Sequence, residues 1–113
     1  MHELAITQSV VDAVTERTGS APVAAVRVWV GRLAGVVPDA MRFCFELVTA
    51  GTPLEGAVLE IEQPEGRGRC RDCGEEFLLP DLVLLCPCGS ADVEVLAGRE
   101  LAVASVVMAA PTG

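Results

Sequence analysis

Four of the five cysteines in this sequence lie within nineteen positions, as a C-x-x-C pair and a C-x-C pair separated by twelve residues. A C-x-x-C turn can direct two thiolates to one metal ion, and a second turn can supply the other two corners of a tetrahedron. Four thiolates in that geometry select zinc, or less often iron, over hard cations. A glycine after each pair, Gly74 or Gly89, lets the backbone turn sharply behind the ligands. The spacing therefore predicts a metal site formed by Cys70, Cys73, Cys86 and Cys88.

The cysteine pattern alone leaves alternatives open. The same four residues could form two disulfides, although paired knuckles at this spacing are typical of zinc sites. A four-cysteine iron site would make the chain an electron carrier, and the colour of the purified protein distinguishes iron from zinc. The second pair is one residue shorter than the usual C-x-x-C, so the sequence leaves open whether Cys86 binds the metal.

The composition predicts a folded, acidic protein. Apolar residues make up 51% of the 113 positions, enough for one modest core, although aromatic residues make up only 4%. The formal net charge is −8 and there is no lysine, which argues against a nucleic-acid partner. The longest apolar run, 101–110, is too short to span a membrane, and the N-terminal residues lack a secretory signal pattern. Clustered cysteines without such a signal indicate the cytoplasm.

Hydrophobic periodicity predicts two helices and three strands. Apolar residues recur at helical spacing in two segments, alternate with other residues in two more, and dominate a last segment rich in valine and alanine. Pro38 occupies the favoured first position of a helix, and Gly19 and Gly51 follow the predicted helix ends. The predicted helices are 3–18 and 38–50, and the predicted strands are 22–34, 57–63 and 100–108. We expect an α+β fold with both helices packed on a three-stranded sheet.

Each predicted helix has an apolar face for the core. The expected faces are Ile6, Val10, Ala13 and Val14 on the first helix and Met41, Cys44, Phe45 and Val48 on the second. Cys44 is therefore expected to be a small buried apolar residue and not a functional thiol.

The cysteine segment divides the sequence into two predicted domains. Residues 65–69 are charged and glycine-rich, and we interpret them as a hinge. Residues 65–97 contain too few apolar side chains to fold unaided, so the metal must supply much of their folding free energy. We expect a zinc-ribbon-like subdomain at 65–97, inserted before the last strand of an α+β domain formed by 1–64 plus 98–113.

The only histidine, His2, directly precedes the first predicted helix. A free α-amine, the amide nitrogen between Met1 and His2, and the imidazole can chelate one metal ion in fused rings, with Glu3 supplying a carboxylate or its own amide. Planar sets of nitrogen donors favour Ni(II) or Cu(II) over Zn(II). Asp39, at the start of the second predicted helix, is a candidate for stabilising the cation from outside the ligand set. The alternative is that His2 is an incidental, solvated residue.

The sequence shows no catalytic set. A single histidine provides no Cys-His pair in a core and no Ser-His-Asp triad, and no phosphate-binding GKS or GKT loop is present. We therefore expect no enzymatic activity.

Five short motifs are distributed over essentially the whole chain: Met1-His2-Glu3-Leu4, Phe43-x-Phe45-Glu46, Cys70-x-x-Cys73, Cys86-Pro87-Cys88-Gly89-Ser90 and Gly98-Arg99-Glu100-Leu101. Together they resemble the HypA/HybF family, the nickel metallochaperones of [NiFe]-hydrogenase maturation. The sequence departs from the second knuckle of that family, C-P-x-C-G-S, because Leu85 stands where a cysteine is expected and Cys86 is one place late.

The resemblance implies nickel at His2 and Glu3, structural zinc at the four clustered cysteines, and delivery of nickel with a GTPase partner, HypB, to the hydrogenase large subunit. We expect the carrier to be a monomer or a homodimer. The alternative function is a zinc-knuckle protein-interaction module in which His2 is incidental and no nickel is transferred.

Overall fold

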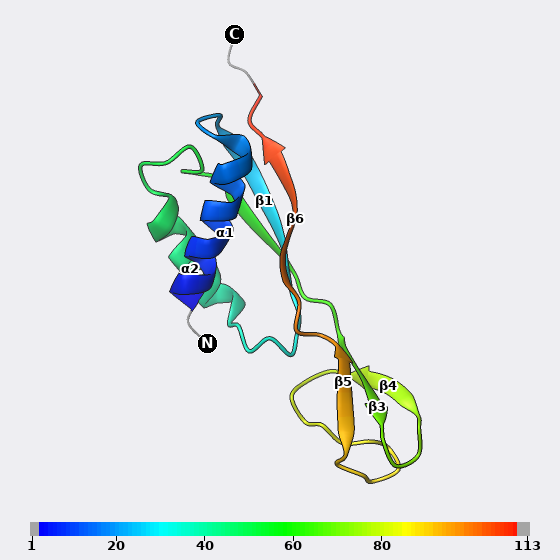
Figure 1. The fold of residues 1–113 in the computed structure, drawn as a ribbon. Coiled ribbons are helices and arrows are strands. Elements are labelled where there is room, and N and C mark those ends of the chain that lie inside the picture. Colours follow the sequence, from blue (N-terminus) through cyan, green and yellow to red (C-terminus); the bar gives the residue numbers. More distant parts are fainter. Residues whose placement is uncertain (1–2, 111–113) are drawn as a thin grey trace. The chain divides into compact units, whose positions relative to one another are not determined.

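A computed structural model of the chain describes residues 3–110 and contains two helices and two three-stranded sheets (Figure 1). The predicted α+β class, with a four-cysteine zinc-ribbon-like part, is confirmed. Among the described residues, neither helix is long and apolar enough to cross a membrane. The elements are α1 (Glu3–Thr18), β1 (Val23–Val30), α2 (Pro38–Thr49), β2 (Val58–Glu62), β3 (Gly66–Cys70), β4 (Glu76–Leu79), β5 (Val93–Ala97) and β6 (Leu101–Met108).

The described residues form two compact units. The first unit comprises residues 3–29, 36–62 and 102–110, and the second comprises 30–35 and 63–101. Strand β1 ends at Val30, so the predicted strand 22–34 is too long, and residues 30–34 group with the second unit.

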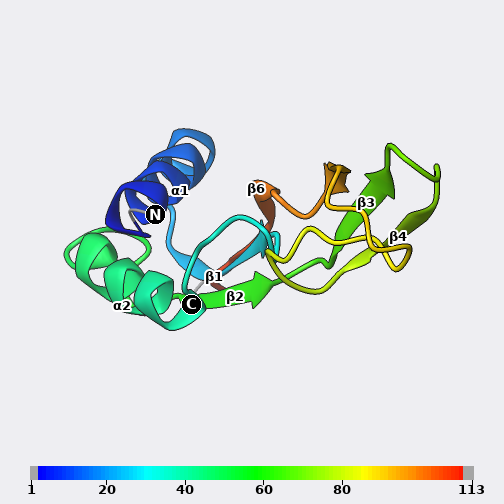
Figure 2. The ribbon, with the colours of Figure 1, turned by 90° about the horizontal axis from the view of Figure 1, so that it is seen from below.

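The first unit is a three-stranded sheet in the order β2-β1-β6 with two helices against one face (Figures 1 and 2). Strands β1 and β2 are parallel, and α2 connects them, as parallel neighbours require a crossover. Strand β6 runs antiparallel to β1, since Ala109 N–H donates to Pro22 O and Gly31 N–H donates to Glu100 O. The buried side of β1 consists of Val23, Val26, Val28 and Val30.

The buried helix faces differ slightly from the predicted ones. On α1 the buried residues are Thr7, Val11 and Val14, whereas Ala13 is exposed. Thr7 is tolerated there because its hydroxyl donates to Glu3 O at 2.6 Å, so no polar atom is left unpaired. On α2 the buried residues are Met41, Phe45 and Thr49, while Cys44 is only half-buried, which corrects the expectation that it is buried.

The second unit is an antiparallel sheet in the order β4-β3-β5, and its small core contains two of the clustered cysteines. The buried members of that core are Leu33, Cys70, Leu79, Cys86 and Val93, with Phe77, Leu84 and Val95 packed against them.

The interpretation of residues 65–69 as a hinge is wrong, because four of these five residues belong to the central strand β3. A Cβ at Gly66 would lie 2.5 Å from Leu33 Cδ1, and a Cβ at Gly68 would lie 2.8 Å from Val93 Cγ1. The glycines therefore permit Leu33 and Val93 to pack closely against β3, whereas the prediction from the sequence attributed them to flexibility.

Candidate metal centre

The four predicted ligands of the cysteine site converge on one point. The Sγ atoms of Cys70, Cys73, Cys86 and Cys88 all lie within 4.8 Å of one another. Cys70 Sγ lies 3.7 Å from Cys88 Sγ, and Cys73 Sγ lies 3.6 Å from Cys86 Sγ. All four cysteines are free, and these separations far exceed a disulfide bond of about 2.0 Å. The structure thus provides four separate sulfur donors.

The spacing of the sulfurs fits a tetrahedral zinc site. With zinc–sulfur bonds of about 2.3 Å, the edges of a regular tetrahedron measure about 3.8 Å. The two distances of 3.6 and 3.7 Å are close to that value. Cys70 and Cys86 are buried while Cys73 and Cys88 are exposed, so the cluster lies at the edge of the small core.

The two knuckles have matching backbone hydrogen bonds despite their unequal lengths. In the first, Cys70 N–H donates to Glu75 O at 2.9 Å, and in the second Cys86 N–H donates to Ser90 O at 2.9 Å. The second turn therefore closes one residue earlier. Gly89, with φ +97°, adopts the left-handed conformation that this tighter turn needs. The closure of the shorter turn explains why Cys86 joins the cluster.

Polar side chains that the sequence analysis did not assign to the site tie the two knuckles together. Ser90 Oγ donates to Asp72 Oδ2. Arg71 Nη1 donates to Asp92 Oδ1 at 2.8 Å, and Arg71 N–H donates to Asp92 O at 2.9 Å. In the sequence, these pairs could have been suspected only from their positions: Arg71 and Asp72 lie inside the first knuckle, and their partners lie just after the second. These contacts hold the knuckles at a fixed separation.

The thiols differ in acidity because their surroundings differ. The backbone N–H of Cys73, 3.4 Å from Cys70 Sγ, lowers the pKa of that thiol from 9.0 to about 6. The N–H of Cys88 acts in the same direction on Cys86, but burial and the neighbouring sulfurs outweigh it and raise the pKa of Cys86 to about 12. At Cys73 the N–H of Glu75 lowers the pKa, whereas desolvation and the sulfurs of Cys70 and Cys88 raise it by more. Without a cation, the cluster retains protons.

Binding of zinc is therefore expected to release about two or more protons per ion at pH 7. The Cys70 thiol is already largely ionised at that pH, whereas Cys73 and Cys86, with their raised pKa values, must lose their protons. Zinc affinity should accordingly rise about 100-fold per pH unit near pH 7. Calorimetric titration of zinc in buffers of different ionisation enthalpy measures the released protons, and a value below one would contradict this electrostatic picture.

The predicted nickel ligands are described only in part. Met1 and His2 lie outside the described residues, and Glu3 is the first residue of α1. Glu3 Oε2 accepts the N–H of Val37, the residue before α2, at 3.4 Å. The start of α1 thus lies beside the start of α2. Asp39, which the sequence suggested as a second source of charge, is exposed and accepts a hydrogen bond from Arg42 Nη1 at 3.1 Å.

The chain matches known proteins over nearly its whole length. Residues 1–108 match the family described as "Hydrogenase/urease nickel incorporation, metallochaperone, hypA". Hydrogenase maturation factor HypA of Geotalea uraniireducens is 52% identical over 104 residues, covering 91% of this chain and 94% of the relative. The protein of the same name from Nostoc punctiforme is 45% identical over 106 residues, covering 94% of each chain.

A solved structure supports the fold. The solution structure of the Ni metallochaperone HypA from Helicobacter pylori superposes with a TM-score of 0.67 at 22% identity, covering 98% of this chain and 100% of that one. Because both the family match and the relatives extend over more than nine-tenths of the sequence, the chain belongs to the HypA family of nickel-incorporation metallochaperones for hydrogenase maturation, a family of carriers and not of enzymes.

Proposed function

We propose that this protein binds Ni(II) through Met1, His2 and Glu3 and delivers it, together with a GTPase of the HypB type, to the large subunit of [NiFe]-hydrogenase. The observation that carries the proposal is the family match, which begins at residue 1 and so includes the sequence Met-His-Glu. We also propose that delivery takes place in the cytoplasm, where free thiols such as those of the cluster remain reduced.

The start of α1 supports a nickel site at this end of the chain. The first four N–H groups of a helix have no acceptor within the helix, so the amide of Glu3 is available as a donor nitrogen once deprotonated. The Thr7 hydroxyl binds Glu3 O, and the Glu3 carboxylate accepts the Val37 N–H. Glu3 is therefore fixed in place, and the metal would be held by a short segment attached to a firm helix.

The donor types suit nickel that must later be released. An α-amine, an amide nitrogen and an imidazole form a nitrogen-rich set, which Ni(II) accepts more readily than Zn(II). The amine and the imidazole belong to adjacent residues, so chelation closes small rings with little loss of chain entropy. Because few of these ligands are locked by packing, a receiving site can replace them one at a time.

The four cysteines serve a structural role in this proposal. Four protein ligands fill a tetrahedral zinc site and leave no position for substrate or cargo. Two of the sulfurs belong to the core of the second unit, so their loss would remove both a ligand and a packing partner. In this proposal zinc stays bound to the protein, whereas nickel is passed on to the receiving protein.

A protein-interaction role of the zinc-binding unit without nickel transfer is the second candidate. The loop before the second knuckle exposes three apolar side chains, Leu82, Val83 and Leu85, at 61%, 65% and 52%. Adjacent exposed apolar residues are typical of contact surfaces. A binding surface of this kind would not depend on His2.

Hydrogenase activity in cells separates these two functions. In a strain that lacks its own HypA-family protein, expression of the wild-type chain is expected to restore [NiFe]-hydrogenase activity. Expression of His2→Ala is expected to give an activity at least about tenfold lower, since even changes to the residues that support a metal ligand cost that much. Gln8→Ala, an exposed change on the same helix, is the matched control and should behave as wild type. Full restoration by His2→Ala would favour the interaction module.

A further inference from the structure

Ser90, which follows the second knuckle, makes three hydrogen bonds around the four-cysteine site. Its carbonyl oxygen accepts the N–H of Cys86 at 2.9 Å. Its hydroxyl donates to Asp72 Oδ2 inside the first knuckle and accepts the N–H of Asp92 at 3.1 Å. One small residue therefore connects the two knuckles with each other and with the residue before β5.

The second knuckle has fewer backbone contacts to its own sulfur than the first. In the first knuckle, the N–H groups of Cys73 and Asp72 both lower the pKa of the Cys70 thiol. In the second, one N–H acts in this direction, that of Cys88, which lies 3.4 Å from Cys86 Sγ. The C-x-C spacing has one residue less between its cysteines and so offers one backbone donor less. The geometry of the shorter knuckle therefore depends more on contacts from outside it.

The pairing of β3 with β5 places the group that supplies such a contact. These strands pair antiparallel up to the cluster, and the pairing continues one residue further, where Arg71 N–H donates to Asp92 O at 2.9 Å. The side chains of the same two residues form an ion pair at 2.8 Å. Asp72 comes next in the chain, and its carboxylate meets the Ser90 hydroxyl. The sheet thus holds the acceptor in place for the second knuckle.

We propose that Ser90 is a positioning residue of the four-cysteine site, whose hydroxyl holds the short second knuckle against Asp72 of the first and thereby slows the release of zinc. The inference rests on the proposed binding of structural zinc at the cluster. Residues that support metal ligands raise metal affinity by about 10- to 100-fold. A hydroxyl that donates to a carboxylate forms a charge-assisted hydrogen bond, and Ser90 is half-buried, so it should act within this range.

The ion pair between Arg71 and Asp92 should contribute less than Ser90. Both side chains are 55% exposed, and an exposed ion pair changes an equilibrium by no more than about fivefold. The main effect is therefore assigned to the serine hydroxyl and its acceptor.

Transfer of zinc from the full-length, zinc-loaded chain to an excess of the chelator 4-(2-pyridylazo)resorcinol measures the rate of release. Ser90→Ala should release zinc at least about tenfold faster than wild type, and Ser90→Thr, which keeps the hydroxyl, should release it at the wild-type rate. Asp72→Ala removes the same hydrogen bond without a change in the second knuckle and should also accelerate release. The double variant should be no faster than Ser90→Ala alone, because both changes remove one shared interaction.

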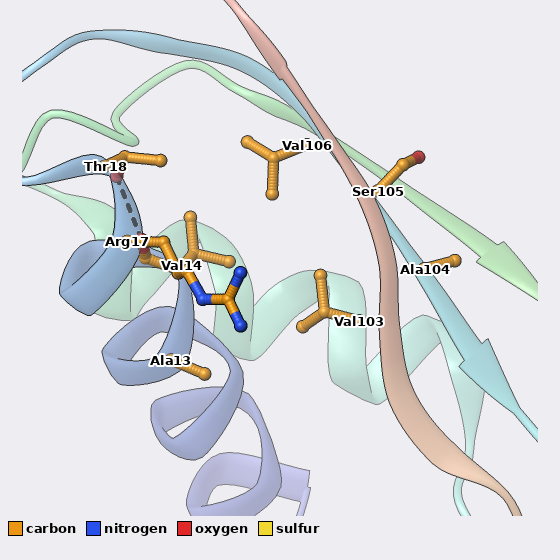
Figure 3. Close-up of a pocket in the computed structure, with 8 residues that line it drawn as sticks. All are labelled: Ala13, Val14, Arg17, Thr18, Val103, Ala104, Ser105 and Val106. Atoms are coloured by element: carbon orange, nitrogen blue, oxygen red, sulfur yellow. Dashed lines mark hydrogen bonds between the residues drawn. The ribbon is translucent and has the colours of Figure 1, made fainter.

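Two substitutions serve as matched controls. Ser105→Ala removes a hydroxyl from an exposed residue of β6 in the first unit, beside a groove between α1 and β6 (Figure 3). Arg69→Ala breaks the exposed pair of Arg69 with Glu76, 3.3 Å apart, which joins β3 to β4 and leaves the second knuckle untouched. Both variants should release zinc at the wild-type rate.

The visible spectrum of the Co(II)-substituted chain separates positioning from a general loss of stability. At saturating cobalt its bands report how the four sulfurs are arranged around the metal. Ser90→Ala should shift and broaden these bands, and Ser90→Thr should keep those of wild type.

Release at the wild-type rate from both Ser90→Ala and Asp72→Ala would overturn the inference and leave zinc binding itself unaffected. Equal acceleration by Ser90→Ala and Arg69→Ala, or unchanged cobalt bands in Ser90→Ala, would overturn it as well. A wild-type chain that binds no zinc would overturn the proposed structural site together with the inference.

Discussion

Removal of the metal from the four-cysteine site is expected to unfold the second unit and leave the first folded. Two of the five buried residues in the core of the second unit are Cys70 and Cys86 of the four-cysteine cluster, and the other three are Leu33, Leu79 and Val93. So small a core cannot offset the conformational entropy of about 45 residues. We propose that zinc binding, which contributes on the order of 10 kcal/mol in small structural sites, supplies the difference.

Cys70→Ser should therefore have the same result as chelation. Two-dimensional amide NMR spectra should lose the dispersed signals of β3, β4 and β5, and those of α1, α2, β1 and β2 should persist. Cys44→Ser is the matched control, because Cys44 is a half-buried cysteine on α2 outside the cluster. It should bind zinc as wild type does. If the signals of the second unit stay dispersed without zinc, or if the first unit unfolds together with the second, zinc does not stabilise the second unit alone.

Gly31→Ala is expected to destabilise the second unit by about 3 kcal/mol or more, at the upper end of the range for overpacking. A Cβ at this position would lie 2.0 Å from Gly98 O and 2.7 Å from Glu100 Oε2. The neighbouring backbone cannot move aside easily, since Gly31 N–H donates to Glu100 O and Leu33 N–H donates to Gly98 O at 2.8 and 2.7 Å.

Urea unfolding of the zinc-loaded protein measures this effect. Gly35→Ala is the control, because Gly35 has a φ of +75° and open space around the position of a Cβ. It should cost only the penalty of a left-handed residue, about 1–2 kcal/mol. Equal costs for the two substitutions would show that the close approach at Gly31 is relieved by a local shift.

The parts of the fold that the sequence predicted well are those with strong local signals. The first helix was predicted at 3–18 and is observed at Glu3–Thr18, because its apolar spacing and the glycine after its last residue mark both ends. Strand β1 was predicted to continue to 34 and ends at Val30. Leu33, which the predicted strand 22–34 includes, packs with the second unit. Such a change of packing partner is a tertiary effect that periodicity does not reveal.

The second unit was predicted least well, for a physical reason. Its strands have four or five residues, and β3 is composed of glycine, arginine and a cysteine, with no apolar alternation. The glycines of β3 are required by the side chains of Leu33 and Val93, which are distant in sequence. The composition therefore suggested a flexible segment, whereas the glycines are needed because these side chains pack closely against β3.

The clustering of the four cysteines was predicted from the sequence, but its geometry was not. Spacing identified all four sulfurs, and the doubt about Cys86 arose from counting residues in the second knuckle. The hydrogen bond from Cys86 N–H to Ser90 O shows how a shorter turn brings its sulfur into the cluster. The hydrogen bond between Ser90 and Asp72 depends on the folded arrangement of the knuckles, which spacing does not give.

Nickel titration of the untagged, zinc-loaded protein tests whether Met1, His2 and Glu3 form the nickel site. Wild type is expected to bind one nickel ion per chain, with affinity rising as the pH increases through the ordinary pKa values of imidazole and an α-amine, about 6.5 and 8. His2→Ala should lose stoichiometric binding while its zinc content and circular dichroism remain unchanged. A chain extended at its N-terminus should also bind weakly, because the extension converts the amine of Met1 to an amide. If wild type, His2→Ala and the extended chain all bind one nickel ion with the same affinity, Met1, His2 and Glu3 are not the nickel site.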